Sequence, residues 1–185
     1  MKSILGILEK YATTKNVVAG ILLIVVFNSI LFSKFSELLS DTEITEKSIL
    51  DLKFSYTTAV AYTFFEALGE EGRNTYKLAE IFIDFPYALI YGFTYAFIIL
   101  MLLKINQLKK LFFLSLVPFL ISWFDILENS GIVAMLVKYP TKLETICNFT
   151  ATFTALKWVF AVITLLIIVI NLIYLIISTL FLKYK

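Results

Sequence analysis

The residues best suited to chemistry are charged side chains inside segments that are otherwise apolar. Asp125, Glu128 and Asn129 lie in one such segment, and Lys157 lies in the next. An ionisable side chain facing hydrocarbon is costly, so such residues usually face the interior of a helix bundle and mark a functional site. We therefore expect these side chains to meet inside the protein.

Two carboxylates beside one lysine leave one negative charge without a partner. The surplus carboxylate must be protonated, or neutralised by a bound cation or by Arg73. In one hypothesis Asp125 and Glu128 act as acid and base, while Lys157 stabilises developing negative charge. In the alternative, Lys157 only neutralises its neighbours, and the ion pair fixes the register of the helices.

A second set of polar side chains recurs every three or four residues in another apolar segment, which places them on one face of a helix. The set is Tyr76, Glu80, Asp84, Tyr87, Tyr91 and Tyr95. Of these, Glu80, Asp84, Tyr87 and Tyr91 are the ligand-binding candidates, because the outer tyrosines also suit an interfacial or packing role. Asp84, Asp125 and Glu128 offer oxygen ligands for Mg²⁺ or Ca²⁺ as an alternative. We assign no metal site and no cofactor from the sequence.

The only arginine beside fifteen lysines is Arg73, in the segment Gly69-Glu70-Glu71-Gly72-Arg73. A guanidinium binds carboxylate or phosphate through a planar fork. At the mouth of a membrane span, Arg73 is expected either to hold a lipid head group or to clamp a nearby carboxylate in a loop. The segment is not a P-loop, because it lacks the Gly-Lys-Ser/Thr ending.

Composition excludes several classes of chemistry. The 185 residues contain no histidine and one cysteine, Cys147. Imidazole zinc sites, Ser-His-Asp triads and histidine proton relays are therefore excluded, as are an internal disulfide and thiolate clusters. The net charge of +2, with basic residues mainly at helix ends, argues against nucleic acid as a partner.

Hydrophobic residues make up 60% of the chain and gather in long runs. A run of about 20 apolar residues spans a membrane as a helix. The runs predict four spans, at residues 17–32, 79–103, 111–137 and 149–181. The expected fold class is an all-α membrane protein, with residues 1–185 forming one integral domain built as a four-transmembrane-helix bundle.

An additional amphipathic helix is predicted between the first two spans, over residues 49–68. Ser48 and Asp51 fit a capping box at its start, apolar side chains recur at helical spacing, and Gly69 suits the left-handed position that ends a helix. We expect this helix to lie on the outer membrane surface or to cap the bundle. Residues 41–47 are the expected linker before it.

Basic residues near short segments predict the orientation of the chain in the membrane. They precede the first span, fill the link between the second and third, and end the chain: Lys2, Lys10, Lys15, Lys104, Lys109, Lys110, Lys183 and Lys185. An even number of spans places all of them on one side. Both termini are therefore expected in the cytoplasm, and the expected location is a cell membrane, that of a bacterium.

Several short motifs together resemble a group of small bacterial membrane proteins with four helices. The motifs are LGEEGRNTY at 68–76, FIDFPYALIYG at 82–92, FDILENSG at 124–131, KYP at 138–140 and LKW at 156–158. The group is similar in its G-E-E-G-R-x-x-Y outer loop, its D-x-x-E-N motif in the third span and its Lys-Trp pair in the fourth. The resemblance implies an architecture and a set of candidate positions, and it implies no activity.

Three functional hypotheses follow. In the first, an outward-opening polar site inside the bundle binds a lipid or small amphiphile, with Asn129 orienting it; whether the molecule is also modified stays open. In the second, the carboxylates and Lys157 form the relay of a proton- or cation-coupled transporter. In the third, the chain is a non-catalytic assembly or sensor subunit. The expected partners are membrane lipids and such a ligand, with a homo-oligomer left open.

Overall fold

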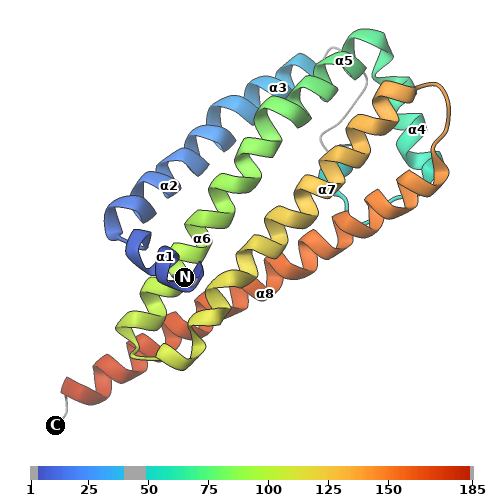
Figure 1. The fold of residues 1–185 in the computed structure, drawn as a ribbon. Coiled ribbons are helices and arrows are strands. Elements are labelled where there is room, and N and C mark those ends of the chain that lie inside the picture. The colour runs from blue at the N-terminus through green and yellow to red at the C-terminus, as the bar shows by residue number, and fades with distance from the viewer. Residues whose placement is uncertain (1–3, 40–48, 184–185) are drawn as a thin grey trace.

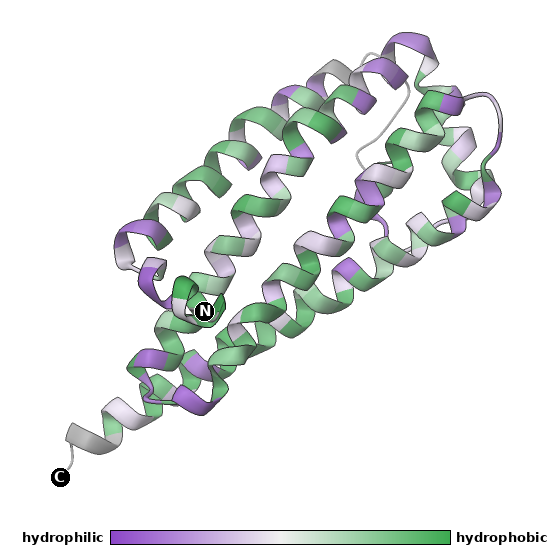
Figure 2. Ribbon diagram, in the orientation of Figure 1, coloured by the Kyte–Doolittle hydropathy of each residue, from purple (hydrophilic) through white to green (hydrophobic). Residues whose placement is uncertain are grey.

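The computed structural model describes residues 4–39 and 49–183, and within these ranges it contains helices and no strand (Figure 1). Four helical segments are long and apolar enough to cross a membrane: Thr14–Phe35, Gly69–Ile105, Lys109–Lys138 and Glu144–Leu180. Apolar residues follow the length of these segments, and many of the hydrophilic ones lie near their ends (Figure 2). The chain is therefore a multi-pass membrane protein by its architecture. The expected linker, 41–47, and Ser48 lie outside the described residues.

The first span is preceded by a short helix that the sequence analysis did not predict. This helix, α1 (Ile4–Tyr11), packs Leu8 into a small core with Leu100 of the second span. The span itself consists of α2 (Thr14–Val26), a π-helical turn (Phe27–Phe32) and α3 (Ser33–Leu39). It therefore extends beyond the predicted range of 17–32 at both ends.

The second span begins ten residues before the predicted position 79, because the helix starts at Gly69. Helix α5 (Gly69–Ala79), a π-helical turn (Glu80–Asp84) and α6 (Phe85–Ile105) follow one another without a break. The prediction of a loop at Gly69–Arg73 is wrong, because these residues form the start of α5. The glutamates in this first turn interact favourably with the helix dipole. The left-handed position of Gly69 is confirmed by its φ of 64°.

The π-helical turn in this span lies directly before a proline. Pro86, in the first turn of α6, lacks an N–H, so the regular hydrogen-bond ladder is interrupted there. The N–H of Phe85 instead donates to the carbonyl of Glu80, five residues back. Such widened turns recur at functional sites, and this one carries both Glu80 and Asp84.

The third span comprises a 3₁₀ segment (Lys109–Leu116) and α7 (Val117–Lys138), and the fourth is α8 (Glu144–Lys183). Helix α7 packs against both α6 and α8. A Cβ added at Gly92 would collide with the Ser122 hydroxyl, and one at Gly131 would collide with that of Thr150. Small residues at these crossings let the helix backbones approach closely, as is common between membrane helices.

The predicted amphipathic helix over 49–68 is only partly correct. A 3₁₀ turn (Leu50–Leu52) comes first, and α4 spans only Thr58–Ala67, with the Thr57 hydroxyl accepting from the N–H of Val60. The helix therefore starts at a threonine cap, nine residues later than predicted. Its Phe65 side chain is fully buried, so α4 packs against the rest of the protein.

The two ends of the bundle differ in the segments that they carry. Helix α1, the link between α6 and α7, and the final turns of α8 lie at one end, called here the α1 end (Figure 1). Helix α4, the start of α5 and the link between α7 and α8 lie at the other, the α4 end. The first helix and the final turns of the last helix therefore lie at the same end of the bundle, which is the arrangement expected for an even number of spans.

Candidate functional site

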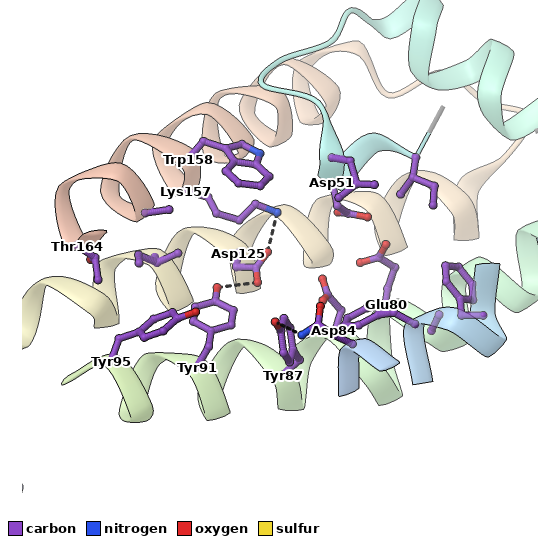
Figure 3. Close-up of a pocket in the computed structure, with 18 of the residues that line it drawn as sticks. Asp51, Glu80, Asp84, Tyr87, Tyr91, Tyr95, Asp125, Lys157, Trp158 and Thr164 are labelled. Atoms are coloured by element: carbon purple, nitrogen blue, oxygen red, sulfur yellow. Dashed lines mark hydrogen bonds and ion pairs between the residues drawn. The ribbon is translucent and has the colours of Figure 1, made fainter. Parts of the chain in front are cut away.

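A cavity of about 630 Å³ lies within the bundle and is lined by residues of all four spans and of the segment 49–52 (Figure 3). Its walls are largely apolar. The polar lining residues are Asn28, Asp51, Tyr76, Glu80, Asp84, Tyr87, Tyr91, Tyr95, Asp125, Lys157 and Thr164. The whole polar stripe expected along the second span therefore faces this one cavity.

At the centre of the site, one lysine contacts two carboxylates. The Nζ of Lys157 lies 2.9 Å from Oδ1 of Asp125 and also forms an ion pair with Glu128. Asp125 and Glu128 stand one helical turn apart on α7, so both reach the same point on α8. Lys157 is 8% exposed, Asp125 3% and Glu128 0%, so this pairing is removed from solvent. The expectation that these side chains meet agrees with this geometry.

Each of the two carboxylates is also held by a hydroxyl group. The Tyr91 hydroxyl donates to Oδ2 of Asp125 at 2.8 Å, and the Thr154 hydroxyl donates to Oε1 of Glu128 at 2.8 Å. Buried charges persist when they are both paired and hydrogen-bonded. The centre of the site is therefore fixed by side chains of α6, α7 and α8.

The candidate acid and base do not have equal access to the cavity. Asp125 and Lys157 line it, whereas Glu128 is not among the described lining residues. Tyr56 lies near Glu128. Burial and the negative charge of Glu128 raise the pKa of the Tyr56 phenol, so Tyr56 stays neutral. A ligand in the cavity would contact Asp125 and Lys157, with Glu128 behind them.

Asn129 acts on the site through Asp84. Its Nδ2 donates to Oδ2 of Asp84 at 2.8 Å, which joins α7 to the π-helical turn. The side chain is fully buried and is not one of the described residues that line the cavity. Asn129 therefore positions Asp84.

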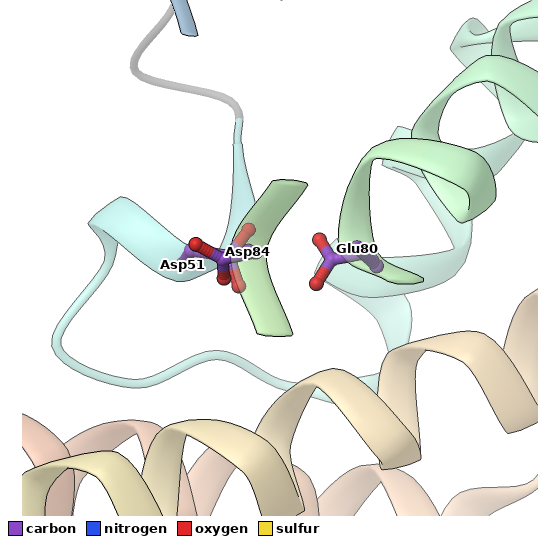
Figure 4. A group of neighbouring side chains, drawn as sticks. All are labelled: Asp51, Glu80 and Asp84. Atoms are coloured by element: carbon purple, nitrogen blue, oxygen red, sulfur yellow. The ribbon is translucent and has the colours of Figure 1, made fainter. Parts of the chain in front are cut away.

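Three carboxylates converge toward the α4 end of the cavity. Asp51, Glu80 and Asp84 each place an oxygen within 4.8 Å of the others (Figure 4). The Tyr76 hydroxyl donates to Oδ2 of Asp51 at 2.8 Å, which ties the segment before α4 to α5. Asp51 was not predicted as a site residue, because its position suits a helix cap and no local pattern places it beside Glu80.

Aromatic side chains form the wall of the cavity next to the first span. The Tyr87 ring stacks on Phe27 at 5.5 Å and meets the edge of Phe32 at 5.1 Å, while Asn28 donates to its hydroxyl at 2.8 Å. The Tyr91 ring contacts Tyr87 in turn, at 5.3 Å. Tyr87 thus joins the first span to the second.

The rim of the cavity includes Trp158, which the sequence analysis noted only as part of a motif. Its Nε1 donates to the carbonyl of Lys53 at 3.1 Å, so α8 is tied to the segment before α4. The neighbouring lining residues Leu52 and Leu165 are each 59% exposed. This part of the rim is therefore apolar and accessible from outside the bundle.

Arg73 does not line the cavity. Its Nη1 donates to the carbonyl of Phe65 at 3.0 Å, and its guanidinium lies 4.1 Å from the centre of the Tyr139 ring. Of the two roles expected for Arg73, the geometry fits a structural clamp, and it holds a carbonyl rather than a carboxylate. The clamp joins α4, α5 and the end of α7.

The site carries a surplus of negative charge. Its acidic residues are Asp51, Glu80, Asp84, Asp125 and Glu128, and Lys157 is the one cationic side chain that the described part of the chain places in ion pairs with any of them. The site therefore suits ligands that bring positive charge or hydrogen-bond donors.

Comparisons of this chain with protein-family models, with curated proteins and with solved structures give no match. Fold and site define it as a multi-pass membrane protein of four apolar helices, with a largely apolar cavity among them that also contains buried charged side chains.

Proposed function

We propose that this membrane protein binds a lipid or small amphiphile in the cavity between its spans. The observation that carries the proposal is the cavity itself, which combines largely apolar walls with the buried Asp125–Lys157 pair. Its volume of about 630 Å³ falls in the range of ligand pockets, about 300–1,000 Å³. Such pockets typically have apolar linings with a few polar groups that fix orientation.

The arrangement of the lining suits a molecule with two unlike ends. A polar head group would contact Asp125, Lys157 and the Tyr91 hydroxyl, which meet at one point. An apolar chain would lie against lining residues of α7 and α8 such as Ile121 and Ile168. The exposed Leu165 at the rim lies in the fourth span, so a membrane molecule reaches the cavity from the side.

The lysine distribution supports placing the α1 end in the cytoplasm. Lys10, Lys104, Lys109 and Lys110 belong to segments at this end. The carboxylates of Asp51 and Glu80 then lie toward the opposite leaflet, and the polar site opens outward. In a bacterium this membrane would be the cytoplasmic one.

Transport is less well supported than binding. Between the cavity and the α1 end, Ile99, Leu100 and Leu103 are fully buried apolar side chains. Further on, the Asn106 side-chain amide donates to the backbone carbonyl of Asn171 at 2.9 Å. A purely structural role for the polar core is also less well supported, because helix packing alone does not require a cavity of this volume.

Photocrosslinking from inside the cavity tests the proposal. A photoreactive diazirine side chain would replace Ile121, which is 5% exposed and lines the cavity, and the control would carry it at Leu120, which is 40% exposed. We expect one defined amphiphile adduct at position 121 and a mixture matching the bulk lipids at position 120. The same mixture at both positions, or no adduct at 121, would contradict the proposal.

A further inference from the structure

The carboxylates at the α4 end of the cavity have the spacing of ligands around one ion. Asp51 comes from the 3₁₀ turn, while Glu80 and Asp84 come from the π-helical turn and face it (Figure 4). Their oxygens lie within 4.8 Å of one another. Oxygens on opposite sides of a Ca²⁺ ion are about 4.6–5.2 Å apart, twice the usual Ca–O distance.

No ion pair joins any of these three carboxylates to a cationic side chain among the described residues. Lys157 makes its ion pairs with Asp125 and Glu128. Like charges held this close repel each other, most strongly away from water. A bound cation would remove that repulsion.

Buried oxygen atoms at the cluster also lack hydrogen-bond partners. Glu80 is 2% exposed, its carboxylate is directed at the other two, and its Oε2 accepts no hydrogen bond from the described residues. Oδ1 of Asp51 also accepts no hydrogen bond from the described residues. Buried polar atoms normally have a partner, so each such atom requires an explanation.

A polar side chain outside the three carboxylates gives an independent indication of a cation site. Asn129 is fully buried, and its carboxamide is directed at Asp84, to which Nδ2 donates. Its Oδ1 has no hydrogen-bond partner among the residues described. Carboxamide oxygens are ordinary ligands of hard cations, and the carboxamide of Asn129 contacts Asp84, one of the three carboxylates.

We propose that Asp51, Glu80 and Asp84 bind a divalent cation of the hard type, with Ca²⁺ as the best fit. All the donors are oxygens. Oxygen donors favour hard cations over softer metals. Ca²⁺ accepts irregular geometry, whereas Mg²⁺ requires a near-ideal octahedron with distances of about 2.0–2.1 Å. This site differs from the set Asp84, Asp125 and Glu128, because Lys157 occupies the last two. It does not depend on the proposed amphiphile.

The test uses the full chain in detergent, with CaCl₂ and with Tb³⁺ as a luminescent substitute for Ca²⁺. The variant is Asp51→Asn/Glu80→Gln. Its matched control is Glu70→Gln/Glu71→Gln, which removes the same charge from exposed positions on α5. We expect wild type and control to gain thermal stability with Ca²⁺ over EDTA and to give saturable Tb³⁺ luminescence. The variant should lose Ca²⁺ affinity by more than ~10-fold.

A folding readout keeps the result interpretable. In EDTA, Glu80→Gln alone should melt no lower than wild type, because it removes one of three charges that repel each other. Loss of the Ca²⁺ effect in this folded variant would support the site. Equal Ca²⁺ binding by wild type and the cluster variant, or no Ca²⁺ effect on wild type, would overturn it.

Discussion

The Nζ of Lys157 lies 2.9 Å from Oδ1 of Asp125, and this contact joins the fourth span to the third inside the bundle. Glu128 shares the same ammonium group. The pairing explains how two carboxylates on one helix face persist away from water. Lys157 forms no ion pair with the carboxylates near the α4 end, such as Glu80.

Removing the lysine should destabilise the protein strongly. Lys157→Met leaves Asp125 and Glu128 buried without their cation, and breaking a buried ion pair from one side costs about 3–5 kcal/mol. Thermal unfolding in detergent measures the loss. The exposed Lys142→Met serves as control and should change stability little.

Removing all the charges together should restore much of that stability. The triple variant Lys157→Met/Asp125→Asn/Glu128→Gln leaves none of the three positions charged, and such replacements are often nearly neutral. If this variant unfolds as easily as Lys157→Met alone, the ion pair is not what holds the three side chains in place.

The close approach of α6 and α7 should be sensitive to one methyl group. Gly92→Ala would drive a Cβ into the Ser122 hydroxyl, and overpacking of this kind costs about 1–3 kcal/mol. Ser122→Ala removes the atom that is hit, so a double-mutant cycle should show favourable coupling between the two changes. Strict additivity would mean that the helices do not cross at this point.

The start of α4 is tested at its cap. Thr57→Ala removes the hydroxyl that accepts from the N–H of Val60, and loss of such a cap costs about 1 kcal/mol. Thr63→Ala, at an exposed position within the helix, is the matched control and should have a smaller effect. An equal effect at both positions would argue against a helix that begins at Thr58.

Arg73 should matter for stability and not for ligand content. Arg73→Lys loses the planar contact with the Tyr139 ring and the bond to the Phe65 carbonyl, so we expect a loss of about 1 kcal/mol. The amount of amphiphile that co-purifies should stay unchanged. A loss of bound amphiphile at unchanged stability would return Arg73 to the head-group role.

The parts of this architecture that the sequence could predict rest on local patterns. Four apolar runs have the length of membrane spans, and polar residues at helical spacing, from Tyr76 to Tyr95, indicate one helix face. Lys157 was expected beside Asp125 or Glu128 because unpaired charge in a membrane interior is costly. Periodicity and burial cost are properties that a sequence shows directly.

The remaining features depend on tertiary contacts. Asp51 reaches Glu80 because the chain breaks into a 3₁₀ turn before α4, and the Tyr76 hydroxyl holds it there. The capping-box pattern at Asp51 favoured a helix instead. Arg73 suits several partners by its chemistry, and the one it contacts depends on where Tyr139 lies.

Native mass spectrometry of gently extracted protein tests the central claim most directly. Ala161→Phe places a large side chain in the cavity and leaves the residues of the ion pair unchanged, and Ile170→Phe places the same bulk on the same helix at a position that is 62% exposed. We predict a defined bound mass in wild type and in Ile170→Phe, and its absence from Ala161→Phe. The same bound mass in all three proteins, or none in wild type, would contradict a ligand site within this cavity.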